Sequence, residues 1–158
     1  MNSKDECDKI KMMNINNITF KTKRTFVRKL KEDDFDTFCD YMEDNGYDYS
    51  IDEYELIYNK TLNDQDTLGI FLEEELIGAI IIHDTIGYSI KRNYRNQKYM
   101  SEVLNEYINY MFSNQFSNCI KAYVDKNNLC SQKVLLNNNF IKTKEDEKYN
   151  YYERRPYE

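Results

Sequence analysis

The residues best suited to chemistry stand in the stretch NYRNQKYMSE, from Asn93 to Glu102. It separates an alternating apolar segment from a strongly amphipathic one, which is where a loop that opens a helix would lie. The free backbone N–H groups of a helix start, together with the helix dipole, bind phosphate groups. Arg92, Arg95 and Lys98 make the stretch a basic island in an acidic chain. It is therefore either an anion site or a solvated charge run, and it lacks the glycine that phosphate-binding loops usually carry.

Metal chemistry is not indicated by the sequence. The chain has four widely separated cysteines, Cys7, Cys39, Cys119 and Cys130, without a CxxC pair, and a single histidine, His83. These residues cannot complete a common zinc site. We interpret the cysteines as reduced thiols and expect no bound metal.

Length and composition define the broad class of protein. A chain of 158 residues fits one domain with a core of ordinary size. The formal net charge of −6 argues against nucleic acid as a partner and fits a cationic or amine substrate, although an acidic surface also serves solubility alone. No segment approaches the roughly 20 apolar residues of a membrane span, and the N-terminus lacks the apolar core of a signal peptide. We therefore expect a cytoplasmic protein without membrane contact.

Periodicity predicts the elements that precede the basic stretch. Residues 1–18 are polar and without period, which predicts a flexible arm before a domain at 19–158. A strand is expected at 24–30, a helix in KEDDFDTFCDYM and a second helix at 52–62. LGIFL and LIGAIII then form a hairpin around three glutamates, and IGYSI follows as a third antiparallel strand.

A helix buried on one side is predicted directly after the stretch. Apolar residues recur there at helical spacing: Met100, Val103, Leu104, Tyr107, Ile108, Met111 and Phe112. CIKAYVD alternates like a strand, a short helix is expected at 128–137, and a final hairpin turns around 145–147. The strand, helix, strand order predicts a crossover to a parallel neighbour. The whole pattern predicts a single α/β domain with a mixed central sheet of about six or seven strands flanked by about four helices.

Two segments resemble the motifs of one enzyme family, the GNAT superfamily of N-acetyltransferases. IGYSIKRNYRNQKYMSEVL resembles motif A, typically GYWI, two or three residues, then YRGKGYATEAL; the matching residues are Gly87, Tyr88, Ile90, Tyr94, Arg95, Tyr99, Glu102 and Leu104. VDKNNLCSQKVLLNNNF resembles motif B, VDPENxxSxxVLEKLGF, with Val124, Asp125, Asn128, Ser131, Val134, Leu135 and Phe140 in place. The resemblance covers roughly Arg24 to Arg155 and points to the branch that includes ribosomal-protein alanine N-acetyltransferases.

The resemblance implies a splayed GNAT sheet and an acetyl-CoA-dependent N-acetyltransferase, an acyltransferase. In that family the pantetheine arm lies between two diverging strands, and the pyrophosphate meets the start of the motif A helix. The residues implied to bind acetyl-CoA are Ile90, Lys91, Arg92, Arg95, Asn96, Gln97, Lys98, Tyr99, Met100, Ser101, Asn128 and Ser131. The acceptor would be the primary amine of a protein N-terminus or of a small cationic molecule, reacting directly in a ternary complex, and a homodimer is possible by analogy. The alternative is a GNAT-derived CoA-binding or regulatory module without turnover.

The basic stretch departs from the family pattern at its glycines. In motif A, Lys98 replaces one glycine of the family pattern, Asn96 replaces another frequent glycine, and Met100 occupies a position that is usually Gly or Ala. Asn139 replaces the glycine that follows the motif B helix. Asn is the best substitute for a left-handed conformation. We expect Lys98 and Met100 to take helical dihedrals or to displace the ligand slightly, and the ammonium of Lys98 to attract a diphosphate.

Catalytic residues are harder to assign than binding residues. Thr85 occupies the place where the closest branch often has a glutamate base, so the base is unassigned, with His83 and Asp84 as weak candidates. By resemblance, Ser131 would hydrogen-bond the CoA sulfur; otherwise it is an early-helix serine bonded to backbone. Asn128 would contact the cofactor and also fits a helix N-cap, and the two roles are compatible.

Overall fold

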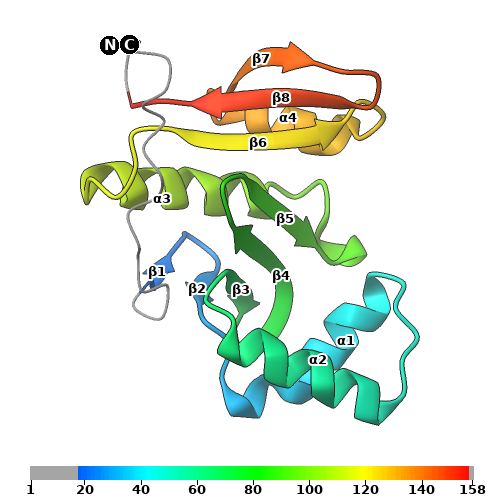
Figure 1. The fold of residues 1–158 in the computed structure, drawn as a ribbon. Helices are drawn as coiled ribbons and strands as arrows, with labels where there is room; N and C mark the ends of the chain where they lie inside the picture. Colours follow the sequence, from blue (N-terminus) through cyan, green and yellow to red (C-terminus); the bar gives the residue numbers. More distant parts are fainter. Residues whose placement is uncertain (1–17, 157–158) are drawn as a thin grey trace.

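The structure, a computed structural model, describes residues 18–156 and divides into two sheets with helices around them (Figure 1). The elements are β1 (Phe20–Lys21), β2 (Phe26–Arg28), η2 (Glu32–Asp34), α1 (Phe35–Asp44), α2 (Ile51–Asn63), β3 (Thr67–Leu72), β4 (Glu75–Ile82), β5 (Ile86–Ile90), η3 (Arg92–Tyr94), α3 (Tyr99–Ser113), β6 (Ile120–Asp125), α4 (Leu129–Asn137), β7 (Ile141–Glu145) and β8 (Tyr149–Arg154). The predicted helices and the three consecutive antiparallel strands are confirmed.

The sheets differ from the expected single mixed sheet in how they join. Strands β1 to β5 form one sheet in sequence order, and a second sheet has the order β6-β8-β7; every paired neighbour is antiparallel. Strands β5 and β6 contact each other without sharing a ladder of hydrogen bonds, and they diverge along their length (Figure 1). The described residues thus hold eight strands rather than six or seven, and the predicted splay separates the two sheets.

The core lies on both faces of the first sheet. The apolar stripe of α3 is buried as predicted, with Val103, Leu104, Tyr107 and Met111 fully buried in a core cluster that includes residues of both sheets. A second cluster packs α1 and α2 against the opposite face, where Phe38 and Tyr58 meet Phe71 of β3. In Figure 1, α3 therefore crosses the middle of the molecule, α1 and α2 lie below it, and the three-stranded sheet lies above.

Gly78 lets β4 approach β5 closely at the end of β5 that borders the gap. A Cβ atom at this position would stand 2.6 Å from the main-chain oxygen of Ser89. A side chain here would push β5 out of place, because real Cβ contacts are essentially never so short. The glycine thus fixes the position of one of the two diverging strands.

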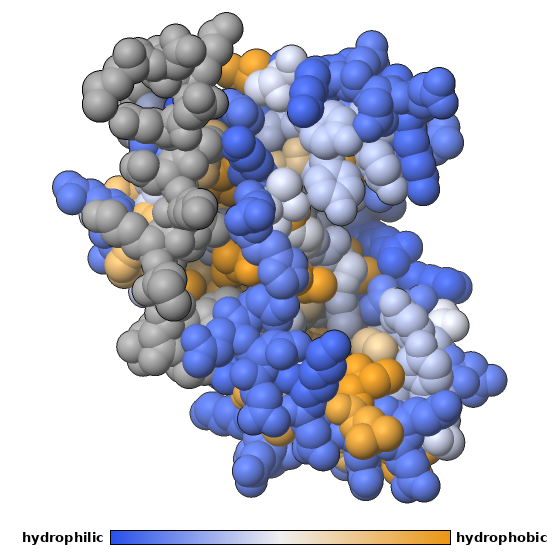
Figure 2. Space-filling model, in the orientation of Figure 1, coloured by the Kyte–Doolittle hydropathy of each residue, from blue (hydrophilic) through white to orange (hydrophobic). Residues whose placement is uncertain are grey.

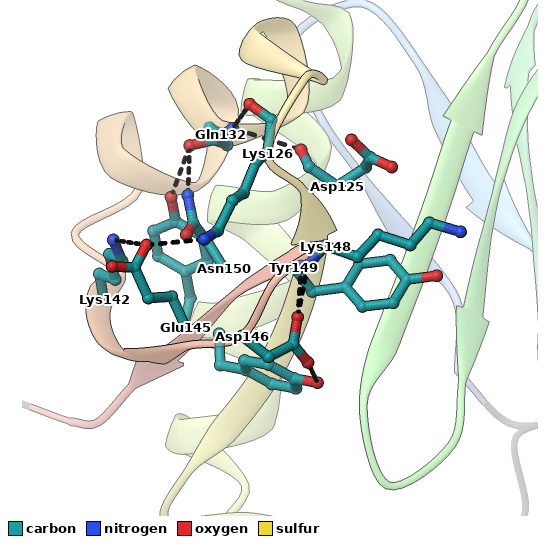
Figure 3. Close-up of polar contacts among 11 residues, drawn as sticks. Asp125, Lys126, Gln132, Lys142, Glu145, Asp146, Lys148, Tyr149 and Asn150 are labelled. Carbon is teal, nitrogen blue, oxygen red and sulfur yellow. Dashed lines mark hydrogen bonds and ion pairs between the residues drawn. The ribbon is translucent and has the colours of Figure 1, made fainter.

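A half-buried polar cluster ties the C-terminal sheet to α4. Gln132 of α4 accepts hydrogen bonds from Asn150 Nδ2 at 3.0 Å and Tyr152 Oη at 3.1 Å, and donates to the Lys126 carbonyl at 2.9 Å. Figure 3 shows Gln132 reaching from the helix toward β8 and the end of β6. Because Gln132 is held against the sheet, the rotation of α4 about its axis is fixed.

The N-terminal arm and the cysteines differ in part from what the sequence predicts. The predicted arm lies outside the described residues except for Ile18, which is buried in the core. The thiols of Cys39 and Cys130 are free, as expected, but Cys119 is disulfide-bonded, so that expectation is wrong for it. Residues 18–156 contain no helix long and apolar enough to cross a membrane, and no group of three or more His, Cys, Asp or Glu side chains that could hold a metal ion.

Candidate active site

A cleft of about 500 Å³ lies between the end of β5 and the start of α3 on one side and α4 on the other. Its walls come from the end of β5, the loop into α3, the first turn of α3, and α4 with the loop before it. The lining residues are Tyr88, Ser89, Ile90, Tyr94, Arg95, Asn96, Lys98, Tyr99, Met100, Ser101, Asn128, Cys130, Ser131, Lys133, Val134 and Asn137. On the face drawn in Figure 2 the surface is mainly hydrophilic, and its outline is notched between the C-terminal sheet above and the α1–α2 region below.

The loop into α3 has the backbone of a glycine loop without a glycine. Asn96 has φ 60° and Lys98 has φ 67° and ψ 10°, both left-handed. The expectation for Asn96 is confirmed. Of the two alternatives for Lys98, helical dihedrals are contradicted: it keeps the left-handed geometry, which costs a non-glycine residue about 1–2 kcal/mol. The other alternative, a slightly displaced ligand, stays a prediction. Met100 is helical as expected and is buried in the α3 stripe.

The start of α3 leaves its backbone donors open. Lys98 is the N-cap residue and supplies no side-chain hydrogen bond to the helix, and the first main-chain bond of α3 runs from Glu102 N to Lys98 O at 3.0 Å. The N–H groups of Tyr99, Met100 and Ser101 precede that bond, and helices leave such groups without partners inside the helix. All three residues line the cleft. Donors and helix dipole together favour an anion here.

Three cations stand in the walls of the cleft. They are Arg95, Lys98 and Lys133, and none of them forms an ion pair within 4 Å with a carboxylate of the described residues. Arg95 instead donates from Nε to the Ile90 carbonyl at 3.0 Å, which holds its side chain at the end of β5. Cations without carboxylate partners, in a chain of net charge −6, favour an anion in the cleft.

The α4 wall is held in place by two main-chain contacts of Ser131. Its N–H donates to Asn128 Oδ1 at 3.1 Å, so the N-cap interpretation of Asn128 is confirmed. Its carbonyl accepts a hydrogen bond from the Tyr88 hydroxyl of β5 at 2.9 Å, which joins the two walls. Burial raises the pKa of Tyr88, so this hydroxyl keeps its proton at neutral pH.

Some predicted residues lie outside the cleft lining. Lys91 pairs with Glu75 at 3.4 Å, the main-chain N–H of Arg92 donates to Asp44, and the Gln97 amide donates to the Asn93 carbonyl. The two weak base candidates are in the turn between β4 and β5, where His83 Nε2 lies 3.0 Å from Asp66. The remaining nine predicted residues, Ile90, Arg95, Asn96, Lys98, Tyr99, Met100, Ser101, Asn128 and Ser131, come together in the lining.

The structure adds cleft residues that the sequence reasoning missed. Cys130 and Lys133 lie one and two positions from the predicted Ser131 on α4, and this closeness to a motif serine was the signal available in the sequence. Ser89 of β5 is hydrogen-bonded to the buried hydroxyl of Tyr41 from α1, a contact between distant segments that no local pattern indicates. Tyr94 donates to Glu75, and this carboxylate raises the pKa of Tyr94 to about 12.

The diverging strands and the open start of α3 are features of the GNAT fold. The chain belongs to the GNAT acetyltransferase family, because the family described as "Acetyltransferase (GNAT) domain" matches residues 24–141. The resemblance drawn from the two motifs is thus confirmed. Transfer of an acetyl group from acetyl-CoA is general to this family, which makes the chain an acyltransferase by class.

Solved structures share the fold at low sequence identity. An acetyltransferase (GNAT family) from Bacillus anthracis is 20% identical with a TM-score of 0.76, covering 87% of this chain and 98% of its own. The ribosomal-protein-S5-alanine acetyltransferase from Vibrio fischeri is also 20% identical, with a TM-score of 0.71 and coverage of 88% and 97%. RimL, a ribosomal L7/L12 alpha-N-protein acetyltransferase solved with coenzyme A, is 16% identical, with a TM-score of 0.74 and coverage of 87% and 98%. No curated protein matches the chain.

Proposed function

We propose that this chain binds acetyl-CoA in the cleft between β5 and α4 and transfers the acetyl group to a primary amine. The observation that carries the proposal is the start of α3, where uncapped N–H donors and unpaired cations line one cleft. A diphosphate matches both features, since it offers acceptor oxygens and negative charge at one place. The pantetheine arm would follow the gap between β5 and β6, where no hydrogen-bonded ladder closes the space.

The cations divide into two groups with different tasks. Arg95 and Lys98 belong to the loop that opens α3, so we assign them to the pyrophosphate. Lys133 comes from α4 on the other wall, and we assign it to a further phosphate of CoA. This arrangement would hold the cofactor from both sides, which favours one orientation of the thioester between the walls.

Transfer then requires a neutral amine and a leaving thiolate. The amine nitrogen forms a bond to the acetyl carbonyl carbon, the C–S bond breaks, and its electron pair leaves on sulfur. We assign Ser131 to hydrogen-bonding that sulfur, because it lines the cleft on a helix fixed by Gln132 and Asn128. The acceptor amine would be a protein N-terminus or a small cationic molecule.

The second candidate function is CoA binding without turnover, favoured by the chemistry of the lining. The described lining residues include no Asp, Glu or His, so none of them offers the carboxylate or imidazole that most often serves as a general base. In the enzyme proposal the amine proton is lost to water, and kcat/KM must rise with pH as the acceptor deprotonates. In the binding-module proposal acetyl-CoA binds, but no acceptor in a broad amine panel releases CoA.

Cys130 provides a direct test of cofactor binding that needs no acceptor. Its thiol is exposed and lines the cleft, whereas that of Cys39 lies half-buried on α1. Alkylation by iodoacetamide, followed by peptide mass mapping, should show that acetyl-CoA protects Cys130 and leaves the labelling of Cys39 unchanged. Equal labelling of Cys130 with and without millimolar acetyl-CoA would contradict the proposal.

A charge reversal locates the pyrophosphate. Lys98→Glu should weaken acetyl-CoA binding, measured by calorimetry, by about tenfold or more, because a carboxylate would replace an ammonium at the anion site. Lys60→Glu on α2 makes the same change of net charge outside the cleft lining and should leave affinity within about twofold. Equal effects of the two variants would remove Lys98 from the site.

A further inference from the structure

Arg24, far from the motifs in sequence, clamps the start of α3 through three kinds of contact. Its Nε and Nη2 atoms reach the two carboxylate oxygens of Glu102 at 3.1 and 3.0 Å. Its guanidinium lies 3.7 Å from the centre of the Tyr99 ring. Nη2 also donates to the main-chain carbonyl of Gln97 at 2.5 Å. The clamp thus joins the loop, the first residue of the helix and its first turn.

The contact with Gln97 acts on the strained part of the loop. Gln97 stands between the two left-handed residues, Asn96 and Lys98. The carbonyl of Gln97 and the N–H of Lys98 belong to one planar trans peptide, so they point in opposite directions. Fixing that carbonyl therefore fixes the N–H of Lys98, and it holds the peptide that must keep the left-handed geometry without a glycine.

The contact with Glu102 neutralises a negative charge near the start of α3. Glu102 is an acidic residue in the first turn of α3, close to the open N–H groups. An unpaired carboxylate there would repel an incoming phosphate, and the bidentate pair with Arg24 neutralises it. The pair is about one-third exposed, with side-chain exposures of 32% and 30%. We propose that Arg24 is a positioning residue for the anion loop and that it sets the affinity of the cleft for acetyl-CoA.

Arg28 provides a matched control within the same chain. It makes the same three kinds of contact: a bidentate pair with Asp34 at 2.8 and 3.0 Å, a stack 3.8 Å from the centre of the Phe71 ring, and a bond to the Lys29 carbonyl at 2.9 Å. Its partners lie beside α1 rather than beside the cleft. If such a clamp only stabilised the fold, replacing Arg24 and replacing Arg28 would thus have the same kinds of effect.

The first experiment measures the loop without any cofactor. Amide hydrogen exchange is followed on peptides covering 93–104 in the full chain, in Arg24→Met and in Arg28→Met. Exchange of this segment should accelerate about tenfold in Arg24→Met and remain unchanged in Arg28→Met, because only the first variant frees the loop. Unchanged exchange in folded Arg24→Met would overturn the proposal, whatever the cleft binds. Arg24→Lys keeps the charge without the fork and should show an intermediate acceleration if Arg24→Met does not fold.

The second experiment rests on the proposed function and separates affinity from turnover. Arg24→Met should raise the KM and the dissociation constant for acetyl-CoA about tenfold with kcat changed less than about twofold, since the clamp touches the cofactor site and not the reacting atoms. Arg28→Met should leave both constants unchanged even where it lowers the melting temperature more. Failure of the wild type to bind acetyl-CoA would contradict the proposed function alone. Equal affinities of the wild type and Arg24→Met would contradict the clamp.

Discussion

The two helices that border the cleft begin in opposite ways. Helix α4 has Asn128 as a side-chain cap. After its last residue, Asn137, the chain turns at Asn139 in the left-handed region, with Asn139 N bonded to Leu136 O and Phe140 N to Leu135 O. Helix α3 has no side-chain cap and follows a loop with two strained residues. One helix thus satisfies its own ends, and the other leaves its N–H donors exposed to the cleft.

The difference follows from how each helix is stabilised. Helix α3 buries a continuous apolar stripe over Tyr99–Ser113, while α4 is shorter and fully buries Leu135 alone among its residues. Short helices with little buried surface depend on capping, whereas packing can stabilise a helix whose end is left open. The uncapped start of α3 is therefore possible because the buried side of the helix packs against residues of both sheets.

The largest expected effect tests whether packing holds α3. Leu104→Ala removes a fully buried side chain and should lower the free energy of unfolding by about 2–5 kcal/mol. Leu136→Ala on α4, where the side chain is 54% exposed, should change it by less than about 0.5 kcal/mol. Urea unfolding followed by circular dichroism measures both. Similar losses of unfolding free energy in the two variants would contradict the view that packing stabilises α3 more than α4.

The next effect tests whether α4 depends on its cap. Asn128→Ala removes the acceptor for the Ser131 N–H and should cost about 1 kcal/mol of stability. The same change at the neighbouring Asn127, which is exposed and lies before the cap, should cost little. Unfolding in urea again gives the comparison, and an equal cost at both positions would show that the cap does not stabilise α4.

A smaller effect separates backbone strain from charge at the start of α3. Lys98→Gly relieves the left-handed strain but loosens the unfolded chain, so stability should rise by a net of roughly 0.5–1 kcal/mol. The same variant loses the ammonium, so its acetyl-CoA affinity should fall about threefold or more. Thermal unfolding and calorimetry on one sample measure the two changes. If Lys98→Gly proves less stable than the wild type, the backbone strain inferred at Lys98 is contradicted.

The sequence predicted those parts of the site that local chemistry decides. The left-handed conformations of Asn96 and Asn139 and the capping role of Asn128 follow from the preferences of asparagine itself. Nine of the twelve predicted cofactor residues line the cleft because the motifs place them on the loop and on adjacent helix turns. The acetyl-CoA contacts of all twelve remain a prediction.

The missed features depend on contacts between distant segments. The geometry of Lys98 contradicts its intrinsic preference, and the Arg24 clamp on Gln97 lies 73 residues away in sequence. Lys133 joins the cleft because Gln132 fixes the rotation of α4 against β8. None of these contacts leaves a periodic signal in the chain.

The smallest expected effect concerns the bond that joins the two walls. Tyr88→Phe removes the hydrogen bond to the Ser131 carbonyl and should cost about 0.5–1 kcal/mol at neutral pH. Burial raises the pKa of Tyr88 above its ordinary value of about 10, so the unfolded chain loses this proton first as the pH rises. The unfolded state then binds fewer protons than the folded state, and stability falls as the pH rises above about 10.

The pH dependence of stability distinguishes Tyr88→Phe from the wild type in addition to the lost hydrogen bond. Burial also raises the pKa of Tyr41 and Tyr107, so alkaline destabilisation persists in Tyr88→Phe but with one fewer titrating group. Urea unfolding at a series of pH values from 8 to about 11 should show a shallower decline than in the wild type. Parallel declines would mean that Tyr88 titrates alike in both states, and that the contact between β5 and α4 opens in solution.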